Sequence, residues 1–140
     1  MSEIIPFPKL KKQLVNNIYL AIRNEQFDEA YELFETYEQH FEMDDDLSIK
    51  KCEVLKSCGY YLELREEASI LLNQGHPLYD KIVIYFVESL YFLEQYQTVV
   101  EIINQIKDEN IEHATRMALL PIQDMAKEKL NQRQLKASEV

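Results

Sequence analysis

The chain has 140 residues, of which 46% are hydrophobic and 29% charged, and its formal net charge at pH 7 is −10. This length fits one soluble domain whose core needs no metal or disulfide bond. Two glycines and four prolines are too few for an all-β domain of this size, because tight turns between strands require such residues. The composition therefore favours helices.

The negative charge is concentrated in one stretch. From Asn24 to Asp46 there are ten acidic residues and no Lys or Arg. Such a surface repels phosphate, so nucleic acid is excluded as a partner there. Two interpretations stay open, a solvated helix face and an acidic docking surface for a basic partner. The candidate acidic surface comprises Glu25, Asp28, Glu29, Glu32, Glu35, Asp44, Asp45 and Asp46.

The two cysteines and the hydropathy pattern indicate a reducing, aqueous compartment. Cys52 and Cys58 are six residues apart on one expected helix, which places their side chains too far apart to form a disulfide. No basic segment followed by an apolar stretch opens the chain, so no secretory signal is expected. The most apolar run, Ile82 to Val87, is too short to span a bilayer. We therefore expect a cytoplasmic protein with no membrane contact.

Taken in chain order, residues 1–8 are expected to form an extended leader, since Pro6 and Pro8 disfavour a helix there. From Leu14 to Phe41 apolar residues recur at spacings of three and four. This pattern predicts two amphipathic helices joined by a short turn, the first from about Lys9 and the second over about 27–41.

A second pair of helices is expected over about 47–62 and 65–74. Asp44, Asp45 and Asp46 offer N-caps to the first of them. Gly59 lies inside the expected helix, and we interpret it as a point of close approach to a neighbouring helix. Gly75 is expected to end the second helix in the left-handed conformation.

Residues 82–93 have the composition of a buried strand at their start but continue apolar for twelve residues. This length exceeds a usual strand, so we predict a buried helix from Pro77 or Leu78 to Leu93. A sixth helix is expected over about 97–106. A seventh begins near Ile111, and Pro121 is expected to kink or split it. Its inward face is predicted to comprise Ile111, Ala114, Ala118, Ile122 and Met125, and fraying is expected over 131–140.

The second helices of the three pairs begin alike, with Phe27 to Ala30, Arg65 to Ala68 and Tyr96 to Val99. The distances in sequence between the last residues of successive motifs lie on either side of 34 residues, which is the length of a tetratricopeptide unit. Over roughly residues 9–108 the chain resembles the tetratricopeptide-repeat family. The resemblance implies an all-α superhelical stack of about three antiparallel helix hairpins, over about 9–43, 46–75 and 77–108. A capping helix over 110–130 follows them.

The opening residues IIPFPKLKKQL resemble the start of longer bacterial tetratricopeptide-repeat proteins, so the chain is compatible with being the N-terminal part of one. The family resemblance also implies a concave groove lined by the first helix of each pair. Family positions in that groove correspond to Lys12, Tyr19, Lys50, Tyr60, Lys81 and Tyr91. Ammonium groups beside tyrosines would suit an extended peptide with an acidic residue or a C-terminal carboxylate. Val15 and Tyr19 depart from the carboxylate-clamp pattern of chaperone-binding members.

No pattern in the chain indicates catalysis, a cofactor or a metal. His40, His76 and His113 are scattered, and the two glycines, sixteen residues apart, cannot form a phosphate-binding loop. We therefore expect no enzyme, but a scaffold that binds a protein or peptide of unknown identity. One alternative is a self-associating domain, present as a monomer or weak homodimer, that pairs through the aromatic face of the fifth helix. Another alternative is docking of a basic partner on the acidic helix 27–41.

Overall fold

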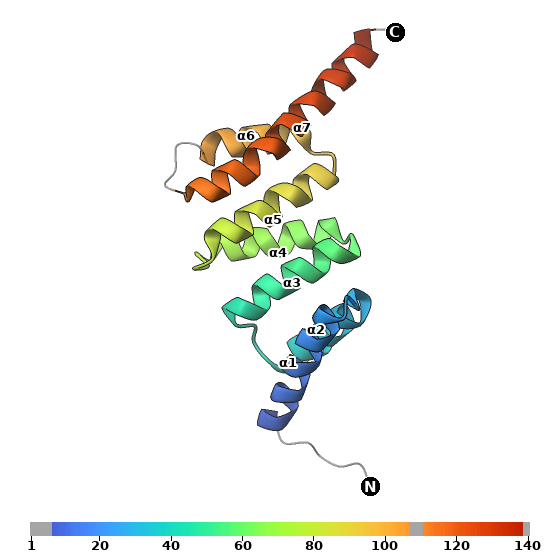
Figure 1. Cartoon of the computed structure of the whole chain (residues 1–140), viewed down its shortest axis with the longest axis vertical. Coiled ribbons are helices and arrows are strands. Elements are labelled where there is room, and N and C mark those ends of the chain that lie inside the picture. The colour runs from blue at the N-terminus through green and yellow to red at the C-terminus, as the bar shows by residue number, and fades with distance from the viewer. Residues whose placement is uncertain (1–6, 107–110, 139–140) are drawn as a thin grey trace. The chain divides into compact units, whose positions relative to one another are not determined.

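A computed structural model describes residues 7–106 and 111–138, and every described regular element is an α-helix (Figure 1). The helices are α1 (Phe7–Arg23), α2 (Phe27–His40), α3 (Asp45–Cys58), α4 (Tyr61–Asn73), α5 (Tyr79–Phe92), α6 (Tyr96–Ile106) and α7 (His113–Ser138). The all-α prediction is thus confirmed, including the helical assignment of the apolar run that begins at Ile82. Residues 1–6 of the expected leader lie outside the described part, while Phe7 and Pro8 belong to α1.

The chain divides into two compact units, Met1–Gly59 and Tyr60–Val140. In the N-terminal unit α1 packs on α2 and α2 on α3. Its core is formed by apolar residues at helical spacing on all three helices: Leu14, Ile18, Ala21, Ala30, Phe34, Tyr37, Leu47 and Val54. The boundary between the units falls inside the second expected hairpin, so a continuous stack of three hairpins stays a prediction.

Two contacts fix the direction of α3 against α2. The Lys51 ammonium, at the middle of α3, forms an ion pair with Glu38 near the end of α2. The Cys58 thiol, the last residue of α3, lies 3.7 Å from the carboxylate of Asp28 in the first turn of α2. The two helices are therefore antiparallel.

In the C-terminal unit α4 packs on α5, α5 on α6, and α7 on both α5 and α6. The same antiparallel relation recurs there. Tyr61 at the start of α4 stacks on Phe92 at the end of α5, with ring centroids 4.5 Å apart. Arg133, late in α7, lies over the ring of Tyr96 at the start of α6, 4.7 Å from its centroid. The first turn of an even-numbered helix thus meets the end of the next helix, as expected of a repeat.

Backbone hydrogen bonds end three helices in the same way. Glu25, Gly75 and Glu94 all have positive φ, at 57°, 71° and 63°. In each case the following N–H donates to the carbonyl five residues back, as Gln26 does to Ala21 at 2.8 Å and Gln95 to Leu90 at 2.9 Å. This is the Schellman arrangement, which satisfies carbonyls that the helix leaves open. The left-handed conformation predicted for Gly75 is confirmed.

The interpretation of Gly59 as a close approach between helices is wrong. Gly59 ends α3 at φ 78°, and nothing lies within 4 Å of a Cβ built on it. It is present because the left-handed conformation favours glycine. The helix expected over 47–62 therefore stops at Cys58, and α4 begins at Tyr61, a full turn before Arg65. Asp44 is the N-cap of α3 and accepts the Leu47 N–H at 2.8 Å.

Helix α7 differs from its prediction in two respects. It is continuous through Pro121 to Ser138, so the split at the proline is wrong, while a bend stays a prediction. Residues 131–138 continue the helix, whereas 139 and 140 lie outside the described part, so fraying of the tail stays a prediction. Of the expected inward face, Ile111 and Ile122 pack against the core, but Ala114, Ala118 and Met125 are exposed. The fully buried positions are Thr115, Leu119, Gln123 and Ala126, so the expected face is only partly correct. Small apolar residues lie on both sides of α7, so their spacing alone could not identify the buried one.

Candidate functional site

Two of the predicted groove residues share one surface of the N-terminal unit. Tyr19 projects from α1 with 38% of its surface exposed. Partial burial raises the pKa of its phenol, as do the negative charges of Asp44 and Asp46, while the Lys50 ammonium lowers it. These charges act on the phenol because the N-terminal part of α3 lies near it. Tyr19 and Lys50 are therefore near each other in the N-terminal unit, and their role in a binding groove stays a prediction.

The other predicted groove residues of this unit differ in their surroundings: one forms an ion pair, one is exposed to solvent and one packs against the core. The Lys50 ammonium is 3.4 Å from the Glu53 carboxylate, and both side chains are 38% exposed. The Lys50 side chain is thus both paired and partly accessible to solvent. Lys12 is exposed on α1, two turns before Tyr19. Val15 packs against the core and contributes little binding surface.

The predicted groove residues of the C-terminal unit do not form a comparable group. Tyr60 is 40% exposed, but it precedes α4 as its N-cap residue and does not lie on α3 as expected. Lys81 is exposed in the first turn of α5 and lines a recess of about 340 Å³ with Asp80. Tyr91 packs against the core, with its ring centroid 5.3 Å from that of Tyr96. Tyr91 is therefore primarily a packing residue.

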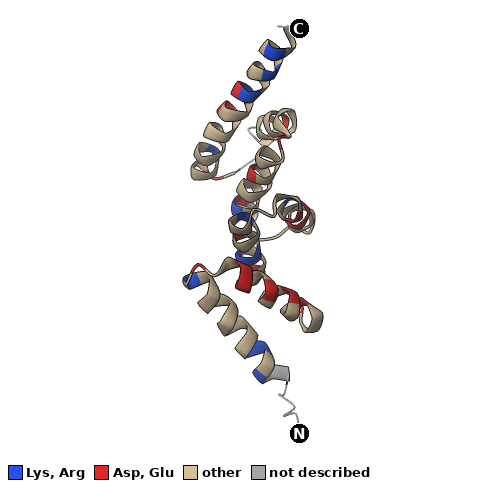
Figure 2. Cartoon of the chain, turned by 90° about the vertical axis from the view of Figure 1, so that its right-hand side faces the viewer, with Lys and Arg blue, Asp and Glu red and all other residues tan. Residues whose placement is uncertain are grey.

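The acidic surface is exposed along α2 and the segment that follows it, and Figure 2 shows acidic residues concentrated on α2. All eight predicted residues, Glu25, Asp28, Glu29, Glu32, Glu35, Asp44, Asp45 and Asp46, are exposed. Some of them have structural contacts, since Asp44 caps α3 and Asp28 contacts the Cys58 thiol. The helix face is thus charged and accessible, with its ends partly engaged by α3.

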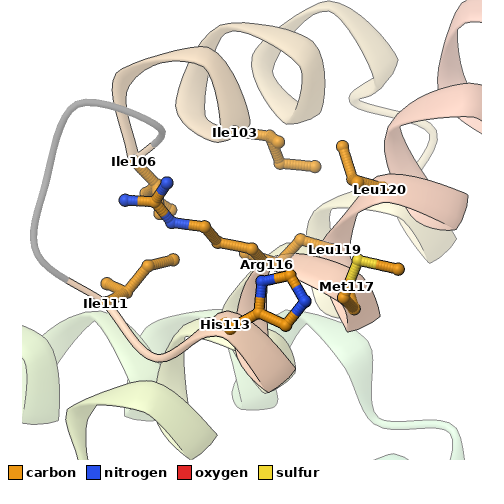
Figure 3. Close-up of a pocket in the computed structure, with 8 residues that line it drawn as sticks. All are labelled: Ile103, Ile106, Ile111, His113, Arg116, Met117, Leu119 and Leu120. Atoms are coloured by element: carbon orange, nitrogen blue, oxygen red, sulfur yellow. The ribbon is translucent and has the colours of Figure 1, made fainter.

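The sequence analysis missed an apolar pocket between α6 and the start of α7 (Figure 3). The pocket has a volume of about 380 Å³ and is lined by Ile103, Ile106, Ile111, His113, Arg116, Met117, Leu119 and Leu120. Met117 is 54% exposed and Leu120 37%, whereas Leu119 is buried. The sequence feature that could have indicated this pocket is the run Met117 to Leu120, which places apolar side chains all around one helical turn.

The aromatic face of α5 is largely covered within the C-terminal unit. Tyr85, Phe86 and Tyr91 are partly buried. Phe92 is 48% exposed, yet one face of its ring stacks on Tyr61. Little aromatic surface therefore remains on α5 for a second copy, and pairing through it stays a prediction.

The described residues contain no group of three or more His, Cys, Asp or Glu side chains that could hold a metal ion. His76 is buried, and its Nδ1 accepts the Leu78 N–H at 2.9 Å, which is a structural role in the turn before α5. Neither Cys52, which is buried, nor Cys58, which is partly buried, forms a disulfide bond. In the part of the chain that the structure covers, no helix combines the length and the apolar character needed to cross a membrane.

The described helices are antiparallel to their neighbours and share repeated end contacts, an all-α arrangement that is consistent with tetratricopeptide-like repeats. The comparison with curated proteins agrees. The chain is 26% identical over 109 residues to the TPR repeat-containing protein YsoA of Bacillus subtilis (strain 168). This alignment covers 78% of the chain but only 33% of the relative, so the chain spans about a third of that protein's length. No protein-family model matches the chain. No solved structure matches it significantly.

Proposed function

We propose that the chain is a protein-interaction scaffold that binds a protein or peptide segment and carries out no catalysis. The observation that carries this proposal is the surface on which Tyr19 and Lys50 are both accessible. A half-exposed tyrosine offers apolar contact area with a hydrogen-bonding hydroxyl, and a nearby ammonium favours a carboxylate. The likeness to a TPR repeat-containing protein supports the same function.

The partner that suits this surface is an extended segment with an acidic residue or a C-terminal carboxylate beside an apolar side chain. The exposed Lys12 of the N-terminal unit and the exposed Lys81 of the C-terminal unit belong to the same predicted set of cations. Asp44 and Asp46 near Tyr19 would disfavour a uniformly acidic ligand, so we expect one or two carboxylates rather than a long acidic tract. The absence of a disulfide bond at Cys52 and Cys58 is consistent with a location in the cytoplasm.

The experiment begins with affinity capture from the source cell and mass spectrometry, followed by affinity measurement with the captured partner. The Lys50→Glu/Lys81→Glu variant should bind it at least about tenfold more weakly, because two attractions become repulsions. Lys9→Glu/Lys11→Glu makes the same change in net charge on exposed lysines outside the predicted groove and should bind normally. Unaltered affinity of the first variant would refute the groove.

Docking of a basic partner on α2 is the second candidate, supported by the exposure of its acidic residues. Salt dependence separates the two candidates. Binding through several exposed charges weakens steeply as ionic strength rises, whereas contact anchored by Tyr19 weakens less. Replacement of Glu29 and Glu32 by lysine should abolish binding only if the acidic surface is used.

A further inference from the structure

The late part of α7 carries a row of cations whose spacing matches a row of carboxylates on α2. Lys129, Arg133 and Lys136 follow one another at four and three residues. On a helix this spacing places them on one face, along about 10 Å of its length. All three are exposed, and Figure 2 shows basic residues in this part of α7.

This basic face is a formed recess within the C-terminal unit. The three cations line a cavity of about 160 Å³ together with Glu94, Tyr96 and Gln132. The Arg133 guanidinium is held 4.7 Å from the centroid of the Tyr96 ring, which is itself 7% exposed. Cation–π contact with a packed ring restricts the guanidinium and leaves its edge available for a carboxylate.

On α2 the residues Asp28, Glu32 and Glu35 repeat the same spacing of four and three with opposite charge, and all three are exposed. If an α2 helix lies parallel to an α7 helix, each carboxylate in this row faces one cation. Opposite charges in matching register favour association and select one alignment.

We propose that the α7 recess binds α2 of a second copy of this chain, in a head-to-tail contact through these six side chains. The pair then retains a vacant acidic row on one copy and a vacant basic row on the other. A heterologous contact of this kind continues from copy to copy and does not close at two unless the geometry returns on itself. The net charge of −10 opposes association, so the contact forms at high protein concentration.

Sedimentation equilibrium at high protein concentration tests the contact. At about 50 mM NaCl the average mass should exceed that of the monomer, and at about 500 mM it should fall to the monomer mass, because exposed charges are then screened. Lys129→Glu/Lys136→Glu should be monomeric in both conditions, and it keeps Arg133 so that the packing on Tyr96 is unchanged. Lys9→Glu/Lys11→Glu, with the same net charge, should associate as the original chain does. A monomeric original chain at low salt overturns the proposal.

A mixing experiment distinguishes this contact from any other mode of self-association. Asp28→Asn/Glu35→Gln neutralises two of the three carboxylates of the acidic row and should also be monomeric alone. Mixed with Lys129→Glu/Lys136→Glu, it supplies the intact basic row and the other variant the intact acidic row, so the mixture should form pairs and nothing larger. Failure of the mixture to pair, with circular dichroism showing both variants folded, refutes the contact between α2 and α7. Binding of the original chain to an acidic segment of another protein, without self-association, refutes it as well.

Discussion

One carboxylate oxygen of Asp80, in the first turn of α5, accepts the hydroxyl of Thr115, in the first turn of α7, at 3.1 Å. The same oxygen accepts the backbone N–H of Glu112, the residue just before α7, at 3.0 Å. Asp80 therefore caps a helix that begins more than thirty residues later in the chain. A carboxylate at a helix N-terminus also interacts favourably with the helix dipole.

Replacement of Asp80 by alanine should lower the free energy of unfolding by about 1–3 kcal/mol, because it removes the partner of two α7 donors. A double-mutant cycle with Thr115→Val should give a coupling energy of about 0.5–1.5 kcal/mol. Urea denaturation followed by circular dichroism measures both. Strict additivity of the two changes would contradict the hydrogen bond.

Glu25 and Glu94 are in the left-handed region, where a side chain is strained. Glu25→Gly and Glu94→Gly should therefore each stabilise the protein by up to about 1 kcal/mol. This net value allows for the opposing effect of glycine, which makes the unfolded chain more flexible. Glu29→Gly, inside α2, is the matched control and should destabilise by about 1 kcal/mol. Thermal melts compare all three, and a loss of stability in the first two would contradict the geometry.

The raised pKa of Tyr19 predicts a specific dependence of stability on pH. Because the folded chain holds the phenol proton more tightly than the unfolded chain, this contribution is complete below about pH 10, the unfolded pKa, and is lost as the pH rises through the folded pKa. Subtraction of the alkaline absorbance titration of Tyr19→Phe from that of the original chain isolates this phenol. Asp44→Asn/Asp46→Asn should shift its titration to lower pH, and no shift would mean that these carboxylates lie too far away.

Leu119 and Leu120 are neighbours in sequence and differ in burial, at 1% and 37% exposure. Leu119→Ala should destabilise by about 2–5 kcal/mol, since it leaves a cavity in the core. Leu120→Ala should cost less than about 1 kcal/mol because its side chain lines an open pocket. Urea denaturation of the two variants tests which side of α7 is buried, and a larger effect at Leu120 than at Leu119 would contradict the burial of Leu119.

Composition and periodicity were sufficient for the helical class and for the helices with one apolar stripe. In α2 the residues Ala30, Phe34 and Tyr37 are all buried, as their spacing indicates. The apolar run at Ile82 was assigned by length, which worked because strands seldom extend over twelve residues. These features depend on local spacing alone.

The errors concern helix ends and faces, which depend on contacts distant in sequence. Gly59 can lie inside a helix or end one, and the surrounding residues suit both. Tyr60 was assigned to the groove because α3 was extended past this glycine. For α7, the buried face is set by packing on α5 and α6, which a sequence pattern with apolar residues on two sides does not record.

The buried amide of Gln123 and the exposed amide of Asn104 join α7 to α6. Gln123, 2% exposed, donates from Nε2 to the Asn104 side-chain oxygen at 2.9 Å and lies 3.4 Å from the Val100 carbonyl. If α7 slid by one turn, that amide would face hydrocarbon and lose both acceptors, at a penalty of about 1–3 kcal/mol. Apolar side chains tolerate such a shift because hydrophobic contacts are non-directional. The hydrogen bonds of Gln123 therefore fix the position of α7 along its axis relative to α6.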